Sequence, residues 1–332
     1  MRLSAHSVLC LLPIISSCAA VYIPILSPNT TNISSEPPNN LSTLPNLPDD
    51  NFRIIASWYH SDLSETACTM VCITAMRSLA LLYFEDDDIP QKAWTHPQFP
   101  GVELTVGPAS QSEKLTVRFA MWMIAAVTRF MMAEDRFQSA HFTGFYRGER
   151  VGVVTFFGAA SDAGGQNSSV SQEPQASALV AGGNILNGVG FSFDGMNSGA
   201  ARNANDQLRA EVQYLGTSIN RRDMLMMIIW LFLWLAPHNR EPLGVWRMAQ
   251  PLLTCEVITL WNRVKQDQYL MTGGDLISFL AYLPEQLLRD NRFEVMDILI
   301  KEGDVMVARG SFRVKPLTGL LGLPPATNVT FF

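Results

Sequence analysis

Residues 112–157, SEKLTVRFAMWMIAAVTRFMMAED-RF-QSAHFTGFY-RGER-VGVVTFF, have the same layout as residues 275–313, DLISFLAYLPEQLLRDN-RF-EVMDILI-KEGD-VMVARGSFR. Each stretch has a long apolar segment with helical periodicity, then an Arg-Phe pair, then two β-rich segments joined by a polar turn. The pairs are Arg136-Phe137 and Arg292-Phe293. This self-similarity predicts an internally repeated architecture in which helices pack on antiparallel sheet.

The surrounding segments predict further strands and helices. Residues 102–157 and 210–262 each read as a strand, a helix and two strands, and residues 275–313 read as a third helix followed by a hairpin. Ser112 and Asp275 are the predicted caps of two of these helices. The chain therefore predicts an α+β fold in which apolar helices pack on antiparallel sheet, with internally repeated β-α-β-β units.

Composition divides the chain into six segments. Pro and Asn clusters near the start, and Gly and Ser clusters in the middle, cannot bury a core of their own. The VGFSF run within the middle segment has the composition of an edge strand. We expect the two α+β units to share one core, although two separate domains are also compatible with the length. The segments are 1–20, a signal peptide; 21–50, a disordered Pro/Asn-rich leader; 51–157, the first α+β unit; 158–209, a Gly/Ser-rich linker or long loop; 210–314, the second α+β unit; and 315–332, a tail.

The first residues have the layout of a secretory signal. Arg2 precedes an apolar run at 8–15 and a group of small residues at 16–20. A short membrane anchor is the alternative, but the run is far below the roughly 20 residues that a spanning helix needs. N-x-Ser/Thr sequons agree with secretion and predict a glycoprotein that is extracellular or held in a cell wall. The sequons begin at Asn29, Asn32, Asn40, Asn167 and Asn328.

Three cysteines, Cys68, Cys72 and Cys255, follow the predicted signal peptide. Three cannot all pair within one chain, so at least one is a free thiol or forms an intermolecular bridge. Cys68 and Cys72 are four residues apart on a helix predicted over 64–84, so they share one face of that helix. A disulfide between either of them and Cys255 is an open alternative. A metal site is disfavoured because no histidine or further cysteine lies nearby, and we predict none.

Charge and hydropathy exclude two classes of function. The formal net charge is -6 and there are no blocks of Lys or Arg, so the basic surface of a nucleic-acid-binding protein is missing. The apolar run at 224–236 would rise about 20 Å as a helix, short of the roughly 30 Å of a bilayer core. We therefore predict a buried helix at 224–236, with neither nucleic acid nor a membrane span involved.

No strong catalytic motif is present. The segment around Ser192 lacks the G-x-S-x-G spacing of a nucleophile elbow, and His60 and His141 have no helical partner for a metal. Residues 182–190 lack both G-x-G-x-x-G and the lysine of a phosphate-binding loop, so we expect no cofactor. Carboxylates on predicted strands could supply the pair that glycoside hydrolysis needs. These carboxylates belong to Glu103, Glu211, Glu256 and Asp297.

Methionine and tryptophan gather on two of the predicted helices, 112–134 and 224–236. Such soft, polarisable faces either fill a core or hold apolar ligands and partner helices. Core filling is the simpler interpretation, and carriage of an apolar small molecule is the alternative. The residues concerned are Met121, Met123, Met131, Met132, Met224, Met226, Met227, Trp122, Trp230 and Trp234.

The chain combines a signal peptide, a sequon-bearing leader, a tryptophan-containing helix and a G-x-x-V-G-V-V strand. This combination resembles uncharacterised secreted proteins of filamentous fungi, and the resemblance implies an origin but no activity or site. It is carried by Leu115, Trp122, Phe137, Phe145, Gly148 and Val151-Gly152-Val153.

The sequence thus favours a secreted, non-catalytic binding or interaction protein, whose partner is an extracellular protein, a glycan or an apolar small molecule. A secreted hydrolase with an unrecognised site is one alternative, and its candidate residues are His60, His141, Ser192 and the strand carboxylates named above. A carrier of an apolar small molecule is the other.

Overall fold

The computed structural model describes most of the two predicted units and two strands outside them. The described residues are 21–24, 48, 51–158, 188–193 and 208–314, with gaps at 86, 111–112, 243, 245, 250–254, 263, 266–267 and 270. All five sequons and the predicted signal peptide lie outside these residues.

In the described part of the chain, two six-stranded antiparallel sheets and four long helices make up most of the fold, which confirms the α+β class. The first half has β2 (Phe52–Asp62), α1 (Glu65–Ala80), β4 (Lys92–Thr95), β5 (Val102–Gly107), α2 (Val117–Ala133), β7 (Gln138–Tyr146) and β8 (Glu149–Gly158). The second half has β10 (Leu208–Ser218), α3 (Arg221–Leu235), β11 (Trp246–Ala249), β12 (Cys255–Asn262), α4 (Gly273–Asp290), β15 (Glu294–Glu302) and β16 (Val305–Val314). Shorter elements are β3 (Asp88–Ile89), β6 (Leu115–Thr116), the 3-10 turn η1 (Ala236–His238), β13 (Val264–Lys265) and β14 (Gln268–Tyr269).

The two sheets have equivalent strand orders. The first sheet has the order β1-β2-β7-β8-β5-β4, and the second, read from its other edge, has the order β9-β10-β15-β16-β12-β11. By position in the sheet, β10 therefore corresponds to β2. The sequence pattern instead matched residues 210–262 to residues 102–157, which would make β10 the counterpart of β5. The two sheets thus have the same topology. That the chain contains an internal repeat of β-α-β-β units stays a prediction.

The first edge strand of each order comes from a segment outside the two predicted α+β units. β1 (Val21–Pro24), in the predicted leader, pairs with β2, and β9 (Gly188–Phe193), in the predicted linker, pairs with β10. The VGFSF run thus forms an edge strand, as its composition indicates. The rest of the leader and linker, apart from residue 48, lies outside the described residues.

Local capping explains where the helices begin. Thr116 accepts a hydrogen bond from the backbone N–H of Phe119, so α2 starts at Val117 and not at the predicted cap Ser112. Asp275 is not the cap of α4 either, because Thr272 takes that position and Asp275 lies three residues inside the helix. The two side chains exchange hydrogen bonds with each other's backbone N–H groups in a capping box.

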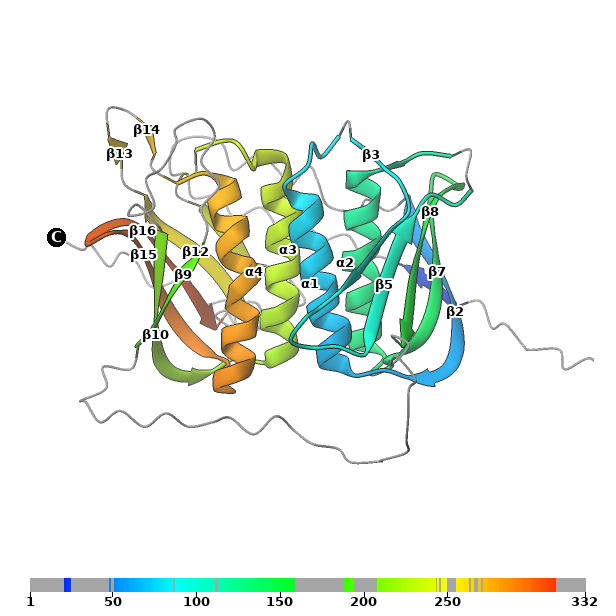
Figure 1. Cartoon of the computed structure of the whole chain (residues 1–332), viewed down its shortest axis with the longest axis horizontal. Coiled ribbons are helices and arrows are strands. Elements are labelled where there is room, and N and C mark those ends of the chain that lie inside the picture. The colour runs from blue at the N-terminus through cyan, green and yellow to red at the C-terminus, as the bar shows by residue number, and fades with distance from the viewer. Residues whose placement is uncertain are drawn as a thin grey trace, which may run out of the picture.

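The four helices lie between the two sheets, so each sheet has one face on the helices and one face pointing away from them (Figure 1). Helix α1 contacts α3 and α4, and α2 contacts α3, so the two halves meet through their helices. The buried apolar residues of both halves form one cluster. The methionines of α2 and α3 are buried in it, which agrees with the core-filling interpretation. None of the described helices is long and apolar enough to span a membrane.

Polar contacts join the two halves at both ends of α1 and α3. At the N-terminal ends, the Arg222 guanidinium donates to both oxygens of Glu65 at 2.8 and 2.7 Å, and Arg221 donates to the Thr66 hydroxyl at 2.6 Å. Beyond their C-terminal ends, the Asn239 amide donates to the Ala80 carbonyl at 2.9 Å. Helices α1 and α3 therefore run in the same direction at the centre of the molecule.

Candidate functional site

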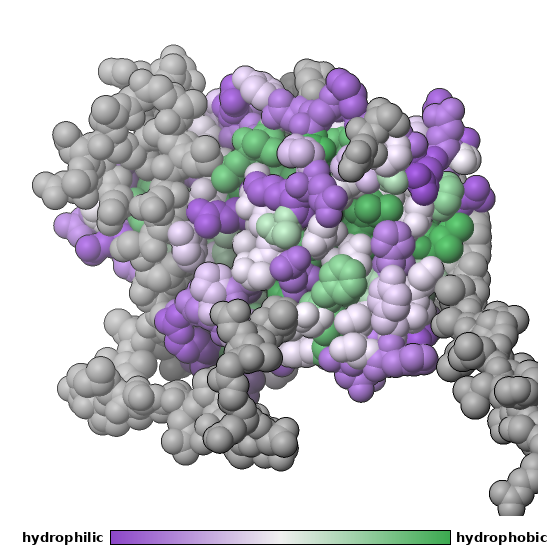
Figure 2. Space-filling model, turned by 45° about the vertical axis from the view of Figure 1, so that its right-hand side comes forward, coloured by the Kyte–Doolittle hydropathy of each residue, from purple (hydrophilic) through white to green (hydrophobic). Residues whose placement is uncertain are grey.

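The outer face of the first sheet carries the arrangement that most resembles a binding site. Side chains alternate between its two faces, so Ala56, Phe142 and Val154 are buried against the helices while their neighbours point outward. Figure 2, in which the right-hand side of Figure 1 comes forward, shows weakly polar and hydrophobic residues interspersed with hydrophilic ones. The visible side of the molecule is therefore not uniformly hydrophilic.

A line of polar side chains crosses the middle of this face. Strand pairing places Ser57 beside His141, His141 beside Thr155, and Thr155 beside Thr105. The His141 Nδ1 and Thr155 Oγ1 atoms are 3.0 Å apart, and the Thr105 hydroxyl donates to Glu103 Oε1 at 3.3 Å. We call these five residues the polar row.

Two exposed aromatic rings lie next to the polar row. Tyr59 and Phe157 are 46% and 45% exposed, their ring centroids are 6.4 Å apart, and their planes differ by 20°. Strand β7 lies between β2 and β8, so the pair bridges across β7, where Ser139 is buried. Phe157 is also the cross-strand partner of Glu103, which joins the aromatic pair to the polar row. We call Tyr59 and Phe157 the aromatic pair.

The electrostatics of His141 favour a neutral ring. Burial lowers the pKa of His141, and the nearby positive charge of Arg150 lowers this pKa further. A neutral imidazole has one donor and one acceptor nitrogen, and Nδ1 is within hydrogen-bond distance of the Thr155 hydroxyl. At neutral pH the polar row therefore contains a single formal charge, on Glu103.

The equivalent positions of the second sheet carry ion pairs. Asp297 takes the place of His141, because it pairs with Ser311 as His141 pairs with Thr155. Its carboxylate accepts from Arg309 at 3.0 Å and also forms an ion pair with Arg313. The outer faces of the two sheets thus share a backbone pattern and differ in chemistry.

The structure separates one of the predicted strand carboxylates from the other three. Glu103 is on the first sheet, whereas Glu211, Glu256 and Asp297 are on the second. Glu211 accepts from Lys301 at 2.7 Å, and Asp297 is neutralised by two arginines. Neither carboxylate is free to act as an acid or a nucleophile.

The predicted catalytic histidines and serine do not come together. His60 is exposed near the end of β2, and His141 lies in the polar row. Ser192 lies in β9 of the second sheet, and its side chain is outside the described residues. Among the described residues no carboxylate is hydrogen-bonded to His141, so the oriented base of a catalytic triad is missing.

The thiols of α1 are buried and unreactive. Cys68 and Cys72 are free, and burial is the main cause that raises the pKa of both thiols, to about 12 for Cys72. A thiol with so high a pKa does not form the thiolate that metal binding or nucleophilic attack requires. Cys255 begins β12, and its side chain lies outside the described residues. In the described part of the chain, no three His, Cys, Asp or Glu side chains are grouped to hold a metal ion.

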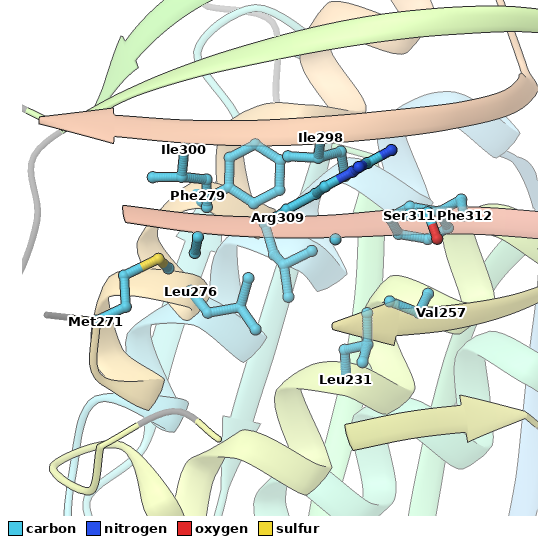
Figure 3. Close-up of a pocket in the computed structure, with 13 residues that line it drawn as sticks. Leu231, Val257, Met271, Leu276, Phe279, Ile298, Ile300, Arg309, Ser311 and Phe312 are labelled. Atoms are coloured by element: carbon cyan, nitrogen blue, oxygen red, sulfur yellow. The ribbon is translucent and has the colours of Figure 1, made fainter. Parts of the chain in front are cut away.

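A small apolar cavity lies between the second sheet and helices α3 and α4 (Figure 3). Its volume is about 30 Å³, and its lining includes Leu231, Phe279 and Ile298. A cavity that binds benzene is about 150 Å³, so this one has room only for a few water-sized groups. Among the described residues it offers no space for an apolar cargo of useful size.

The polar row includes His141 and Glu103, both of which are candidates from the sequence. The aromatic pair was not predicted, because the residues are 98 positions apart and meet only through the order of three strands. The alternation of Phe157 with buried Phe156 was the one available signal that Phe157 points outward. Comparisons with protein-family models, curated proteins and solved structures find no match, so the outer face of the first sheet is the main evidence for function.

Proposed function

We propose that this is a secreted, non-catalytic binding protein whose ligand contacts the outer face of the first sheet. The observation that carries the proposal is the aromatic pair, two exposed rings beside a row of mostly uncharged hydrogen-bonding groups. Secretion is supported by the signal-like first residues and the sequons.

Exposure of the aromatic pair is the reason to expect a ligand. Aromatic side chains are enriched at the centres of binding surfaces because they bury much area at little entropic cost. Among the described residues, Tyr83 is a third large aromatic residue of similar exposure, and it differs from the pair because the Arg240 guanidinium lies over its ring at 4.1 Å. The aromatic pair has no such cationic partner among the described residues.

A hydrolase is the second candidate, and one contact favours it. The proximity of His141 and the Thr155 hydroxyl brings a base and a nucleophile together. Thr155 is buried, however, and no third group orients His141 among the described residues. Binding therefore accounts for more of this face than catalysis does.

The test of the proposal is retention of extracellular material by the immobilised protein. Wild type, the double variant Tyr59→Ala/Phe157→Ala and the control Tyr83→Ala are secreted from a eukaryotic host, purified and coupled to beads. We expect wild type and the control to retain carbohydrate or protein that the double variant does not. Equal retention by all three would rule out this face as the binding surface.

Native mass spectrometry of the secreted, deglycosylated protein tests the carrier alternative. Extra mass that disappears on denaturation would indicate a bound small molecule. We expect the mass of the polypeptide alone, because the cavity is too small for such a cargo.

A further inference from the structure

We propose that the ligand of the outer face of the first sheet is a neutral oligosaccharide, with a sugar ring stacked on the aromatic pair and its hydroxyls bonded to the polar row. This inference rests on the proposed function, because it names the ligand class of the same face.

The aromatic pair matches the apolar face of a sugar. A pyranose ring presents C–H groups on one face, and these carry a slight positive charge. The faces of aromatic rings carry the negative part of a quadrupole and attract such groups. Tyr59 and Phe157 are stacked with planes that differ by only 20°, so a sugar ring that lies parallel to one ring is nearly parallel to both.

The polar row matches the rim of a sugar. Each sugar hydroxyl both donates and accepts hydrogen bonds, and so do the side chains of Ser57 and Thr105, which are only partly buried. His141 Nδ1 is engaged by the Thr155 hydroxyl, so Nε2 is the ring nitrogen left for a ligand, and Glu103 adds a strong acceptor beside Phe157. A wholly apolar partner would cover these groups without satisfying their remaining hydrogen-bonding capacity, which is unfavourable.

Charge selects a neutral sugar over an acidic one. Glu103 is the charged residue of the polar row and the direct neighbour of Phe157, so it repels an anionic ligand at the aromatic pair. The arginines lie toward the opposite end of the face, where the positive charge of Arg150 acts on His141. Arg53 lies over the ring of Phe145, and Arg150 donates to the Ala109 carbonyl at 2.9 Å.

The second sheet shows that the fold does not require an aromatic pair. Arg313 occupies the place of Phe157, since it pairs with Glu256 as Phe157 pairs with Glu103. The same backbone position thus tolerates a charged side chain that is bonded to Asp297. Phe157 is 45% exposed, so much of its ring is accessible to a ligand.

Isothermal titration calorimetry on the full secreted chain, deglycosylated, tests this inference. The probes are neutral hexasaccharides of β-1,3-linked glucose, β-1,4-linked N-acetylglucosamine and mannose, with an acidic hexamer of galacturonic acid for comparison. We expect at least one neutral probe to bind and the acidic probe to bind more weakly. Removal of either ring, as Tyr59→Ala or Phe157→Ala, should weaken binding by roughly three- to tenfold.

Matched variants separate stacking from folding. Tyr59→Phe and Phe157→Tyr keep an aromatic face and should bind about as wild type does, whereas Thr105→Val keeps the shape of the side chain and should weaken binding. Tyr83→Ala removes a ring of similar exposure elsewhere and should have no effect. Urea unfolding of each variant shows whether a loss of binding follows from a loss of stability.

Two results would overturn the inference. One is that no neutral probe binds, and the other is that binding is unchanged in Tyr59→Ala and Phe157→Ala. If the bead assay instead shows a protein partner that depends on the aromatic pair, the glycan is wrong while the proposed function stands. If neither assay depends on the aromatic pair, both are wrong.

Discussion

Gly152 shows how a single residue determines the packing of helix α2 on the first sheet. It lies on the inner face of β8, where an added Cβ would be 2.9 Å from Leu115 Cδ1 and 3.0 Å from the backbone oxygen of Gly107. Because that oxygen belongs to a neighbouring strand, it cannot move without disturbing the sheet. We expect Gly152→Ala to lower the free energy of unfolding by about 1–3 kcal/mol, measured by urea denaturation.

Gly158→Ala is the control for this prediction. Its added Cβ would have no heavy atom closer than 3.8 Å, so we expect little change in stability. Equal effects of the two substitutions would show that loss of glycine flexibility, and not the close approach to Gly107, determines the result.

Helix α4 shows how a short motif starts an element. Thr272 and Asp275 form a capping box in which Asp275 is fully buried. Thr272→Ala removes the hydroxyl that accepts from the Asp275 backbone and donates to its carboxylate at 2.9 Å. We expect this substitution to lower the free energy of unfolding by about 1 kcal/mol or more. Thr272→Ser keeps the hydroxyl and should restore most of the stability in the same denaturation assay, and a Ser variant as unstable as the Ala variant would contradict this role.

His96 links the two halves and makes the stability of the whole molecule depend on pH. Its Nδ1 accepts the backbone N–H of Gln98, so Nε2 carries the proton and donates to Glu285 on α4 at 3.2 Å. Burial lowers the pKa of His96, and Glu285 only partly opposes this. The unfolded chain then binds more protons than the folded one, so the stabilisation is complete above the unfolded pKa of about 6.5 and is lost as the pH falls below it.

We therefore expect the free energy of unfolding to decrease as the pH is lowered from 7 to 5. His141, whose pKa is also lowered, contributes with the same sign. Urea denaturation across this range should give a smaller decrease for His96→Gln than for wild type. A His96→Gln variant with the full decrease would show that other groups are responsible.

Sequence periodicity predicted the class of the fold and most of its elements, because apolar residues repeat locally every two or three to four positions. It placed the start of α2 at Ser112 and the cap of α4 at Asp275, since several polar residues near each start have capping side chains and only the backbone geometry distinguishes them. The proximity of Tyr59 to Phe157 depends on strand order and on the irregular pairing between Trp58 and Asp62, and neither is encoded in local spacing.

Because the helices lie between the two sheets, each sheet has an outer face on an opposite side of the molecule. We expect salt to affect binding at these two outer faces differently. The outer face of the second sheet carries several ion pairs. Dissolved ions screen such charges, with a Debye length of about 10 Å at 0.1 M ionic strength. The first sheet offers rings and hydroxyls, whose contacts with an uncharged ligand are nearly indifferent to ionic strength. Material attached through the first sheet should therefore survive a high-salt wash, whereas material attached through the second should elute.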